Sequence, residues 1–227
     1  METSKAKKTK KSQNSPSEPP KEVLISDAYI DYVLMNGHEP HSVYQFMKTQ
    51  NLSEAEFYEN YNSFSALEKS IWKGMAEETI ARIKGEKVYG GYMAREKLLA
   101  FYFTLIEVLK PNRSFVFYSF RNVKQGELKP AFLKDFRTYF LAFVNDVLRE
   151  AKETAEVVER PLVSNRYDEG LWLQLMFVIN FWLKDDSHAF EKTDAAIEKA
   201  VNFSFDLMGK SVLDSFLDFG KFIYQNK

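Results

Sequence analysis

The chain has 227 residues, and its 31 Lys and Arg against 32 Asp and Glu give a formal net charge of −1. Apolar residues make up 45% and aromatic residues 15% of the sequence, which excludes a chain that is disordered throughout. The nine Gly and seven Pro are too few for a turn-rich β-sandwich or barrel. The absence of Cys excludes disulfides, thiolate metal sites and cysteine catalysis, and we expect a cytoplasmic protein.

The charges are unevenly distributed along the chain. Residues 1–21 carry six Lys, two Glu and almost no apolar side chains, so we expect a disordered basic tail without a signal peptide. Residues 22–80 carry ten acidic and three basic side chains, a net charge of −7, whereas residues 81–227 have a net charge of +2. The near-neutral total therefore conceals an acidic segment, which bears on any interaction with nucleic acid.

The hydrophobic spacing predicts helices along the whole chain and no strands, so the expected class is all-α with about nine helices. The first four are short or medium in length, and the later ones are longer and more apolar. The longest apolar run, Leu171–Leu183, has 13 residues and is shorter than the ~20 needed to cross a bilayer, so no membrane interaction is expected. The expected helices cover Leu24–Met35, a short stretch after Ser42, Ser53–Tyr61, a stretch from Ser63 or Ser65 through Ile80, Tyr92–Leu109, Arg113–Phe120, Pro130–Ala155, Tyr167–Leu183 and Phe190–Tyr224.

Local signals place a tight turn between the second and third helices. Ser42 can accept a hydrogen bond at the start of the second helix, and Asn51 is suited to a left-handed turn. Ser53 and Glu56 have the spacing of a capping box at the start of the third helix. Three short helices with such a turn describe a helix-turn-helix.

Residues Ser42–Leu67, SVYQFMKTQNLSEAEFYENYNSFSAL, resemble the helix-turn-helix of TetR-family transcriptional regulators. The family pattern, T-V-x-D-I-A-x-x-A-G-V-S-K-G-T-L-Y-x-Y-F-x-S-K-E-x-L, aligns with this segment without a gap. The stretch 181–208 also looks like the dimerisation end of such proteins. After the basic tail at 1–21, the resemblance implies a DNA-binding domain at 22–84 and a ligand-binding and dimerisation domain at 85–227.

The positions that face DNA in the family are unusually acidic here. Glu54, Glu56 and Glu59 replace a basic residue, a Thr and a His, and carboxylates repel phosphates. Either the domain binds DNA weakly with help from the lysines of residues 5–11, or it keeps the fold without the function. The candidate DNA-binding residues are Ser42, Tyr44, Gln45, Ser53, Glu54, Glu56 and Tyr58.

Aromatic residues cluster beyond residue 90, either as ordinary core or around an apolar ligand cavity. Gln174 and Asn180 lie in an otherwise apolar helix, so each needs a hydrogen-bond partner from a ligand, a symmetry mate or the backbone. The candidate pocket residues are Phe101, Tyr102, Phe136, Tyr139, Phe140, Gln174 and Phe177.

The last two long helices are expected to form a homodimer, because the helix at residues 167–183 is apolar nearly all round. One side of it can face its own domain while another meets a second chain. The candidate interface residues are Trp172, Leu175, Ile179, Phe203, Leu207 and Phe216.

No motif indicates an enzyme, a nucleotide site, a cofactor or a metal centre. The leading hypothesis is a ligand-responsive, homodimeric transcriptional regulator that binds operator DNA. The alternative is a helical dimer of the same fold that has lost DNA binding and acts as a small-molecule or protein binding module.

Overall fold

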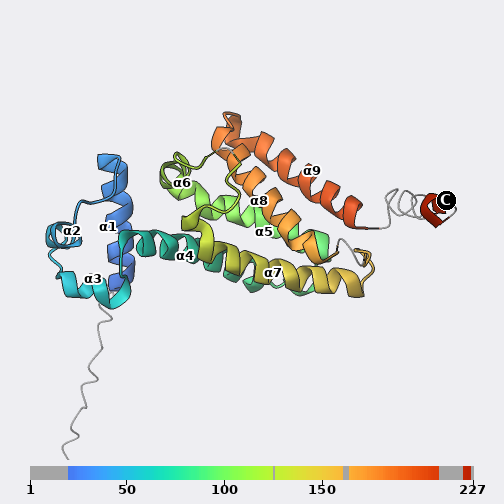
Figure 1. Cartoon of the computed structure of the whole chain (residues 1–227), viewed down its shortest axis with the longest axis horizontal. Helices are drawn as coiled ribbons and strands as arrows, with labels where there is room; N and C mark the ends of the chain where they lie inside the picture. Colours follow the sequence, from blue (N-terminus) through green and yellow to red (C-terminus); the bar gives the residue numbers. More distant parts are fainter. Residues whose placement is uncertain (1–19, 125, 161–163, 210–221, 226–227) are drawn as a thin grey trace, which may run out of the picture.

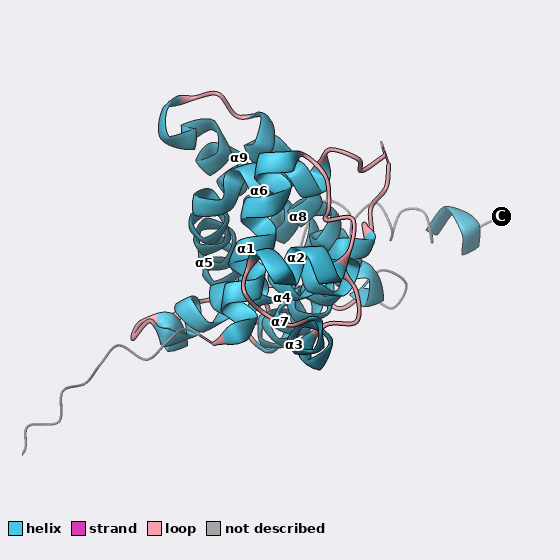
Figure 2. Cartoon of the chain, turned by 90° about the vertical axis from the view of Figure 1, so that its left-hand side faces the viewer, coloured by secondary structure: helices cyan, strands magenta, loops and turns pink. Residues whose placement is uncertain are grey.

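The computed structural model describes residues 20–124, 126–160, 164–209 and 222–225. Within these ranges the chain forms nine α-helices up to Met208, a short helical stretch at residues 222–225, five short 3₁₀ turns and no strand, which confirms the all-α expectation (Figures 1 and 2). The helices are α1 (Lys21–Asn36), α2 (Val43–Thr49), α3 (Glu54–Asn60), α4 (Phe64–Gly85), α5 (Ala94–Leu109), α6 (Arg113–Phe120), α7 (Lys134–Glu153), α8 (Tyr167–Lys184) and α9 (Glu191–Met208). The 3₁₀ turns are Tyr89–Gly91, Lys110–Asn112, Ala131–Leu133, Ser164–Arg166 and His188–Phe190.

Helices α1, α2 and α3 and the first turn of α4 form a head held together by aromatic side chains. The ring of Phe64 on α4 stacks on Tyr29 with a centroid separation of 5.7 Å. The same ring meets Phe46 of α2 at 5.5 Å and Phe57 of α3 at 5.4 Å, both edge to face. Edge-to-face and offset contacts of this kind stabilise more than their buried area alone. One ring from each of the four helices therefore fixes the relative positions of all of them.

Helix α4 belongs to both parts of the molecule, since it leaves the head and runs along the body (Figure 1). From Trp72 onward its inner face is covered by the body: the indole lies 5.8 Å from Phe120 and 6.0 Å from Phe136, and it is fully buried. The expected domain boundary after residue 84 coincides with the last turn of this helix, but the packing of the body begins about three turns earlier.

The body contains α5 to α9 together with most of α4. Helices α4 and α7 lie along one side, and α8 and α9 lie side by side on the other, with α5 between them (Figure 1). The strongly amphipathic α7 points Phe136, Phe140 and Phe143 inward, while its charged side chains face solvent. The result is a bundle whose outermost layer is the pair α8 and α9.

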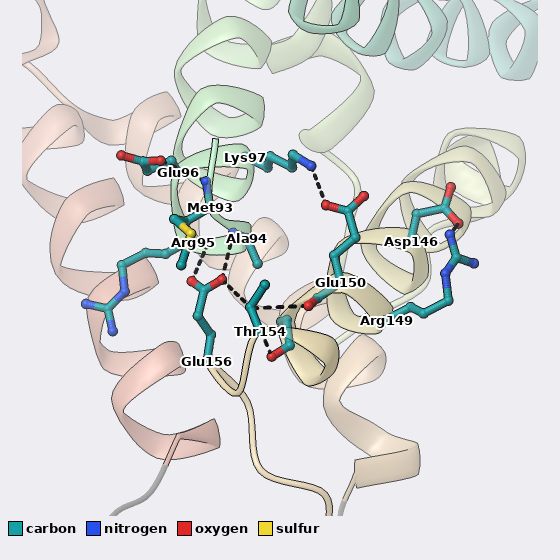
Figure 3. A network of polar contacts seen from close by, with 11 residues as sticks. Met93, Ala94, Arg95, Glu96, Lys97, Asp146, Arg149, Glu150, Thr154 and Glu156 are labelled. Atoms are coloured by element: carbon teal, nitrogen blue, oxygen red, sulfur yellow. Dashed lines mark hydrogen bonds and ion pairs between the residues drawn. The ribbon is translucent and has the colours of Figure 1, made fainter. Parts of the chain in front are cut away.

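A polar network closes the end of the body that is distant from the head (Figure 3). The carboxylate of Glu156, which follows α7, accepts hydrogen bonds from the backbone N–H groups of Ala94 at 3.0 Å and Arg95 at 3.3 Å. These N–H groups lie in the first turn of α5 and have no partner inside their own helix. Lys97, buried in the next turn, pairs with Glu150 on α7. A carboxylate from one helix end thus caps the start of another.

Two helices begin later than the sequence predicts, for local reasons. Helix α5 starts at Ala94 rather than Tyr92, because Tyr89–Gly91 forms a 3₁₀ turn and Glu96 caps the backbone N–H of Met93 at 2.8 Å. Pro130 begins a 3₁₀ turn at Ala131–Leu133, so α7 starts only at Lys134.

The last helix ends much earlier than predicted, and the prediction of a helix through Tyr224 is wrong at Gly209. The backbone becomes extended there, and a Cβ atom would come within 3.0 Å of the carbonyl oxygen of Phe205 and 3.2 Å of that of Glu156. Only glycine fits such a close approach without a shift. Residues 210–221 lie outside the described structure.

Candidate functional site

The head has the local geometry that the sequence predicts, with short helices α2 and α3 joined by a tight turn. Ser42 caps α2 by accepting a hydrogen bond of 3.2 Å from the N–H of Gln45. Asn51 adopts the expected left-handed conformation with φ 56° in the turn between α2 and α3. The capping box is complete: the carboxylate of Glu56 accepts from the N–H of Ser53 at 2.7 Å, and the Ser53 hydroxyl accepts from the N–H of Glu56 at 3.3 Å.

The seven candidate DNA-binding residues share one property, since none of them is buried in the head. Tyr44 on α2 is 56% exposed and Tyr58 on α3 is 54% exposed, whereas Phe46 and Phe57 beside them are buried. Gln45, Ser53 and Glu54 are exposed, and Ser42 and Glu56 are partly exposed. The structure therefore presents polar and aromatic side chains of α2 and α3 to solvent above an aromatic core.

The carboxylate of Glu56 is less free to face DNA than the sequence suggests. Its carboxylate receives the Ser53 hydroxyl at 2.8 Å, and Lys21, the first residue of α1, places its ammonium 2.6 Å from the other carboxylate oxygen. The hydrogen bond from Lys21, together with the capping-box bonds from Ser53, lowers the pKa of Glu56 to about 2. This carboxylate is satisfied within the head, so of the three acids on α3 only Glu54 and Glu59 face solvent without a hydrogen bond in the described structure.

Two basic residues beside this face were missed by the sequence reasoning. Lys48 lies one helical turn after Tyr44 on α2, with its ammonium 3.5 Å from the Tyr44 hydroxyl and 5.5 Å from the ring centroid. Lys21 lies beside α3 through its bond to Glu56. The i, i+4 spacing of Tyr44 and Lys48 was the available signal for the first, whereas the second required knowledge of how α1 and α3 pack.

A long apolar groove runs between the outer faces of α8 and α9. Its volume is about 1170 Å³, and its lining is largely apolar. Phe177 of α8 is 51% exposed and Phe203 of α9 is 67% exposed, which is unusual for side chains of this size. An exposed apolar surface of this extent indicates an interaction site.

Residues 97–223 match the protein family described as tetracyclin repressor-like, C-terminal domain. The chain belongs to the TetR family. A search of curated proteins found no match to the sequence. The match covers most of the body and does not include the head, α1 to α3. Members of the TetR family are regulators rather than enzymes.

The structure separates the residues that the sequence assigned to a TetR-type ligand pocket. Phe101, Tyr102, Phe136 and Phe140 are fully buried, and their rings contact one another or Trp172, so the space between them is filled. Tyr139 lies on another side of α7, with the ammonium of Lys73 5.6 Å from its ring centroid. Gln174 and Phe177 line the groove between α8 and α9 instead.

The expected dimer residues also fall into two groups. Trp172, Leu175 and Ile179 of α8 are fully buried in the core of their own chain and have no surface to offer a second copy. Phe203 and Leu207 of α9 line the groove, where the large exposed apolar residues of α8 are Leu173 and Phe177. Phe216 lies outside the described residues. The groove thus unites two residues expected in a pocket with two expected at an interface.

The end of α6 connects the head to the body. Arg121 donates a hydrogen bond of 2.7 Å to the carbonyl of Gly37, which ends α1 in a left-handed conformation, and its guanidinium lies 4.0 Å above the ring of Tyr118. The Ser119 hydroxyl donates to the carboxylate of Glu68 on α4 at 2.7 Å. Any displacement of α6 would therefore act on both α1 and α4.

Within the described ranges, no group of three or more His, Asp and Glu side chains is arranged to hold a metal ion. None of the helices described there is long and apolar enough to span a membrane.

Proposed function

We propose that this chain is a homodimeric transcriptional regulator of the TetR family that binds operator DNA through α2 and α3. The observation that carries the proposal is the exposed face of the helix-turn-helix, where Tyr44, Tyr58 and Lys48 lie above a fully formed aromatic core. Such side chains on the second and third helices can contact phosphates and base edges in the major groove.

The electrostatics of the head are compatible with this function because one acid is neutralised internally. Lys21 and the capping box satisfy Glu56, and Lys48 supplies a cation on the exposed face. A remaining Glu on a recognition helix can accept a hydrogen bond from the N4 amino group of cytosine. The sequence of residues 1–19 adds five Lys to the three basic residues of residues 22–80, and these lysines would supply further phosphate contacts.

The dimer of this proposal forms through the groove between α8 and α9. Two such helices from each chain would make a four-helix interface about a two-fold axis and cover Phe177 and Phe203. A two-fold dimer places two heads on a pseudo-palindromic site.

Ligand response belongs to the same proposal and would act through α6. A small molecule that shifts α6 would disturb the Arg121–Gly37 contact and the Ser119–Glu68 contact, and so reorient the head. Because the rings around Phe101 and Phe140 fill the core, an apolar ligand there would have to displace them.

The test is salt-dependent binding of the full chain to DNA from upstream of its own gene, measured by fluorescence anisotropy. Lys48→Ala should weaken binding several-fold and reduce the slope of log K against log salt by about 1. Lys84→Ala is the same change in the last turn of α4, far along the chain from α2 and α3. It should leave the affinity for DNA and the salt slope unchanged. A chain that lacks residues 1–19 shows how much the lysine-rich segment contributes.

The second candidate function is a TetR-fold dimer that no longer binds DNA and serves as a binding module. The exposed carboxylates of Glu54 and Glu59 and the net charge of −7 over residues 22–80 favour it. If even long mixed-sequence DNA fails to bind at low salt, this second function is supported and the first is rejected.

A further inference from the structure

A polar pair interrupts the apolar groove between α8 and α9. The side-chain oxygen of Gln174 on α8 accepts a hydrogen bond of 2.9 Å from the hydroxyl of Ser204 on α9. The Nε2 atom of the same Gln174 is buried and makes no hydrogen bond within the part of the chain that the structure describes. Buried amide donors are nearly always paired, so the described part of a single chain leaves this donor without its partner.

The groove has the surface pattern of a helix-packing seam. Along α9, the lining residues Ala196, Ala200, Phe203 and Leu207 recur every three or four positions. The two small residues lie in the first half of this row and the two large ones in the second half, and Phe177 of α8 adds another large side chain to the same surface. A surface that carries both knobs and holes can interdigitate with a second copy of itself about a two-fold axis.

A second copy fits this groove better than a small molecule does. Helices α8 and α9 have 18 residues each and are about 27 Å long, which matches the length of a helix-pair interface. Phe177 and Phe203 both line the groove with at least half of their area exposed, so the isolated chain leaves a large apolar surface in water. A second pair of helices would cover both.

We propose that Gln174 and Ser204 fix the alignment of the two chains in the dimer, with the Gln174 side chain turning outward on association so that its Nε2 donates to the same polar pair of the second copy. This inference rests on the dimer of the proposed function. An apolar seam with a spacing of three to four residues can slide by one helical turn, about 5.4 Å, at little cost. A single buried amide makes the shifted arrangements unfavourable, because it finds its partner in only one of them.

The absence of Cys from the sequence makes alignment directly measurable. Glu198→Cys places one nitroxide label on the exposed side of α9, away from the groove lining, and pulsed electron spin resonance then reports the distance between the two labels of a dimer. The labelled chain with an unaltered groove should give one narrow distribution of label-to-label distances. Gln174→Leu should give a broad or double distribution, while the dimer Kd from analytical ultracentrifugation stays within tenfold or tightens.

Two further variants separate alignment from general damage to α8. Asn180→Leu is the matched amide-to-leucine change on the same helix, but its amide already donates to the carbonyl of Met176 at 2.8 Å and lies outside the groove lining, so the narrow distance should persist. Ser204→Ala, which removes the partner of Gln174 with minimal change of volume, should broaden the distribution. Circular dichroism confirms that each variant is folded.

The outcomes distinguish the two proposals. A monomeric parent chain at micromolar concentration overturns the dimer itself. A dimeric parent whose distance distribution is unchanged in both Gln174→Leu and Ser204→Ala overturns the alignment role and leaves the dimer standing. Loss of dimer formation in a folded Gln174→Leu chain would show that the amide supplies affinity rather than alignment, and would also overturn this inference.

Discussion

The ammonium of Lys21 lies 2.6 Å from a carboxylate oxygen of Glu56, which joins the first residue of α1 to the first turn of α3. The same carboxylate closes the capping box with Ser53. One acidic side chain therefore joins α1 to α3 and also caps the start of α3. It also removes one negative charge from the face that would meet DNA.

Glu56 should make the stability of the chain fall at acidic pH. Its folded-state pKa of about 2 lies below the usual value of about 4.3, so its contribution is present above pH 4.3 and is lost as the pH falls through 2. Thermal unfolding between pH 6 and pH 2 should therefore show a smaller acid-induced decrease of the midpoint in Glu56→Gln than in the parent.

The matched control for this experiment is Glu54→Gln, which removes the same charge from the same turn without touching the capping box. We expect it to keep the acid-induced decrease of the parent. Equal pH profiles for the two variants would contradict the role given to the Lys21–Glu56–Ser53 cluster.

Glu68 should have the opposite pH dependence. Its partial burial between the head and the body raises its pKa, although the hydrogen bond from Ser119 acts against this rise. For an acid with a raised pKa, stability is highest when the group is protonated and decreases as the pH rises through the folded-state pKa. Glu68→Gln keeps an acceptor for Ser119, so it should raise the midpoint by a few degrees at pH 7.5 and by less at pH 4.

Glu78→Gln on the exposed side of α4 serves as the comparison, since it changes the same charge outside the junction. A midpoint for Glu68→Gln that does not change relative to the parent at pH 7.5, or that shifts equally at both pH values, would refute the prediction.

Local chemistry was readable from the sequence, whereas long-range packing was not. Ser42, Asn51 and the Ser53–Glu56 pair lie where their side chains dictate, because caps and left-handed turns depend on a few neighbouring atoms. The contact between Lys21 and Glu56 spans 35 residues and depends on how α1 and α3 pack, which no spacing rule supplies.

Helix α8 shows why the sequence alone could not tell which of its residues face the core and which face the surface. A helix that is apolar nearly all round has no polar stripe to indicate which side faces its own core. Trp172 proved to be inside and Phe177 outside, although both are large aromatic residues. The apolar periodicity also continues past Gly209, so the end of α9 was hidden until its close approach to Phe205 and Glu156 was visible.

Arg160 should be among the most sensitive positions of the body. Its buried guanidinium donates to the hydroxyl of Tyr167 at 2.8 Å and to the carbonyls of Met208 at 3.2 Å and Gly209 at 2.7 Å, where α9 ends. Arg160→Met leaves these carbonyls without this donor, at a cost of about 2–4 kcal/mol in the free energy of unfolding.

Urea unfolding followed by circular dichroism measures that loss. Arg149→Met, in which an exposed guanidinium paired with Asp146 is removed, should cost less than about 1 kcal/mol. Arg160→Lys should fall between the parent and Arg160→Met, because a single ammonium cannot reach all of the acceptors. A loss in Arg160→Met no larger than that in Arg149→Met would be inconsistent with a capping role at the end of α9.

Glu156 should stabilise the body through the start of α5 (Figure 3). Its carboxylate accepts from the backbone N–H groups of Ala94 and Arg95, and a negative charge there also interacts favourably with the helix dipole. Glu156→Ala should lower the free energy of unfolding by about 1–2 kcal/mol, whereas Glu159→Ala, which removes an exposed partner of Lys152, should have little effect. Hydrogen exchange should also be faster at the amides of Ala94 and Arg95 in Glu156→Ala alone, since only this variant removes their acceptor. Protection that is unchanged at these two amides would show that the helix start is held by other contacts.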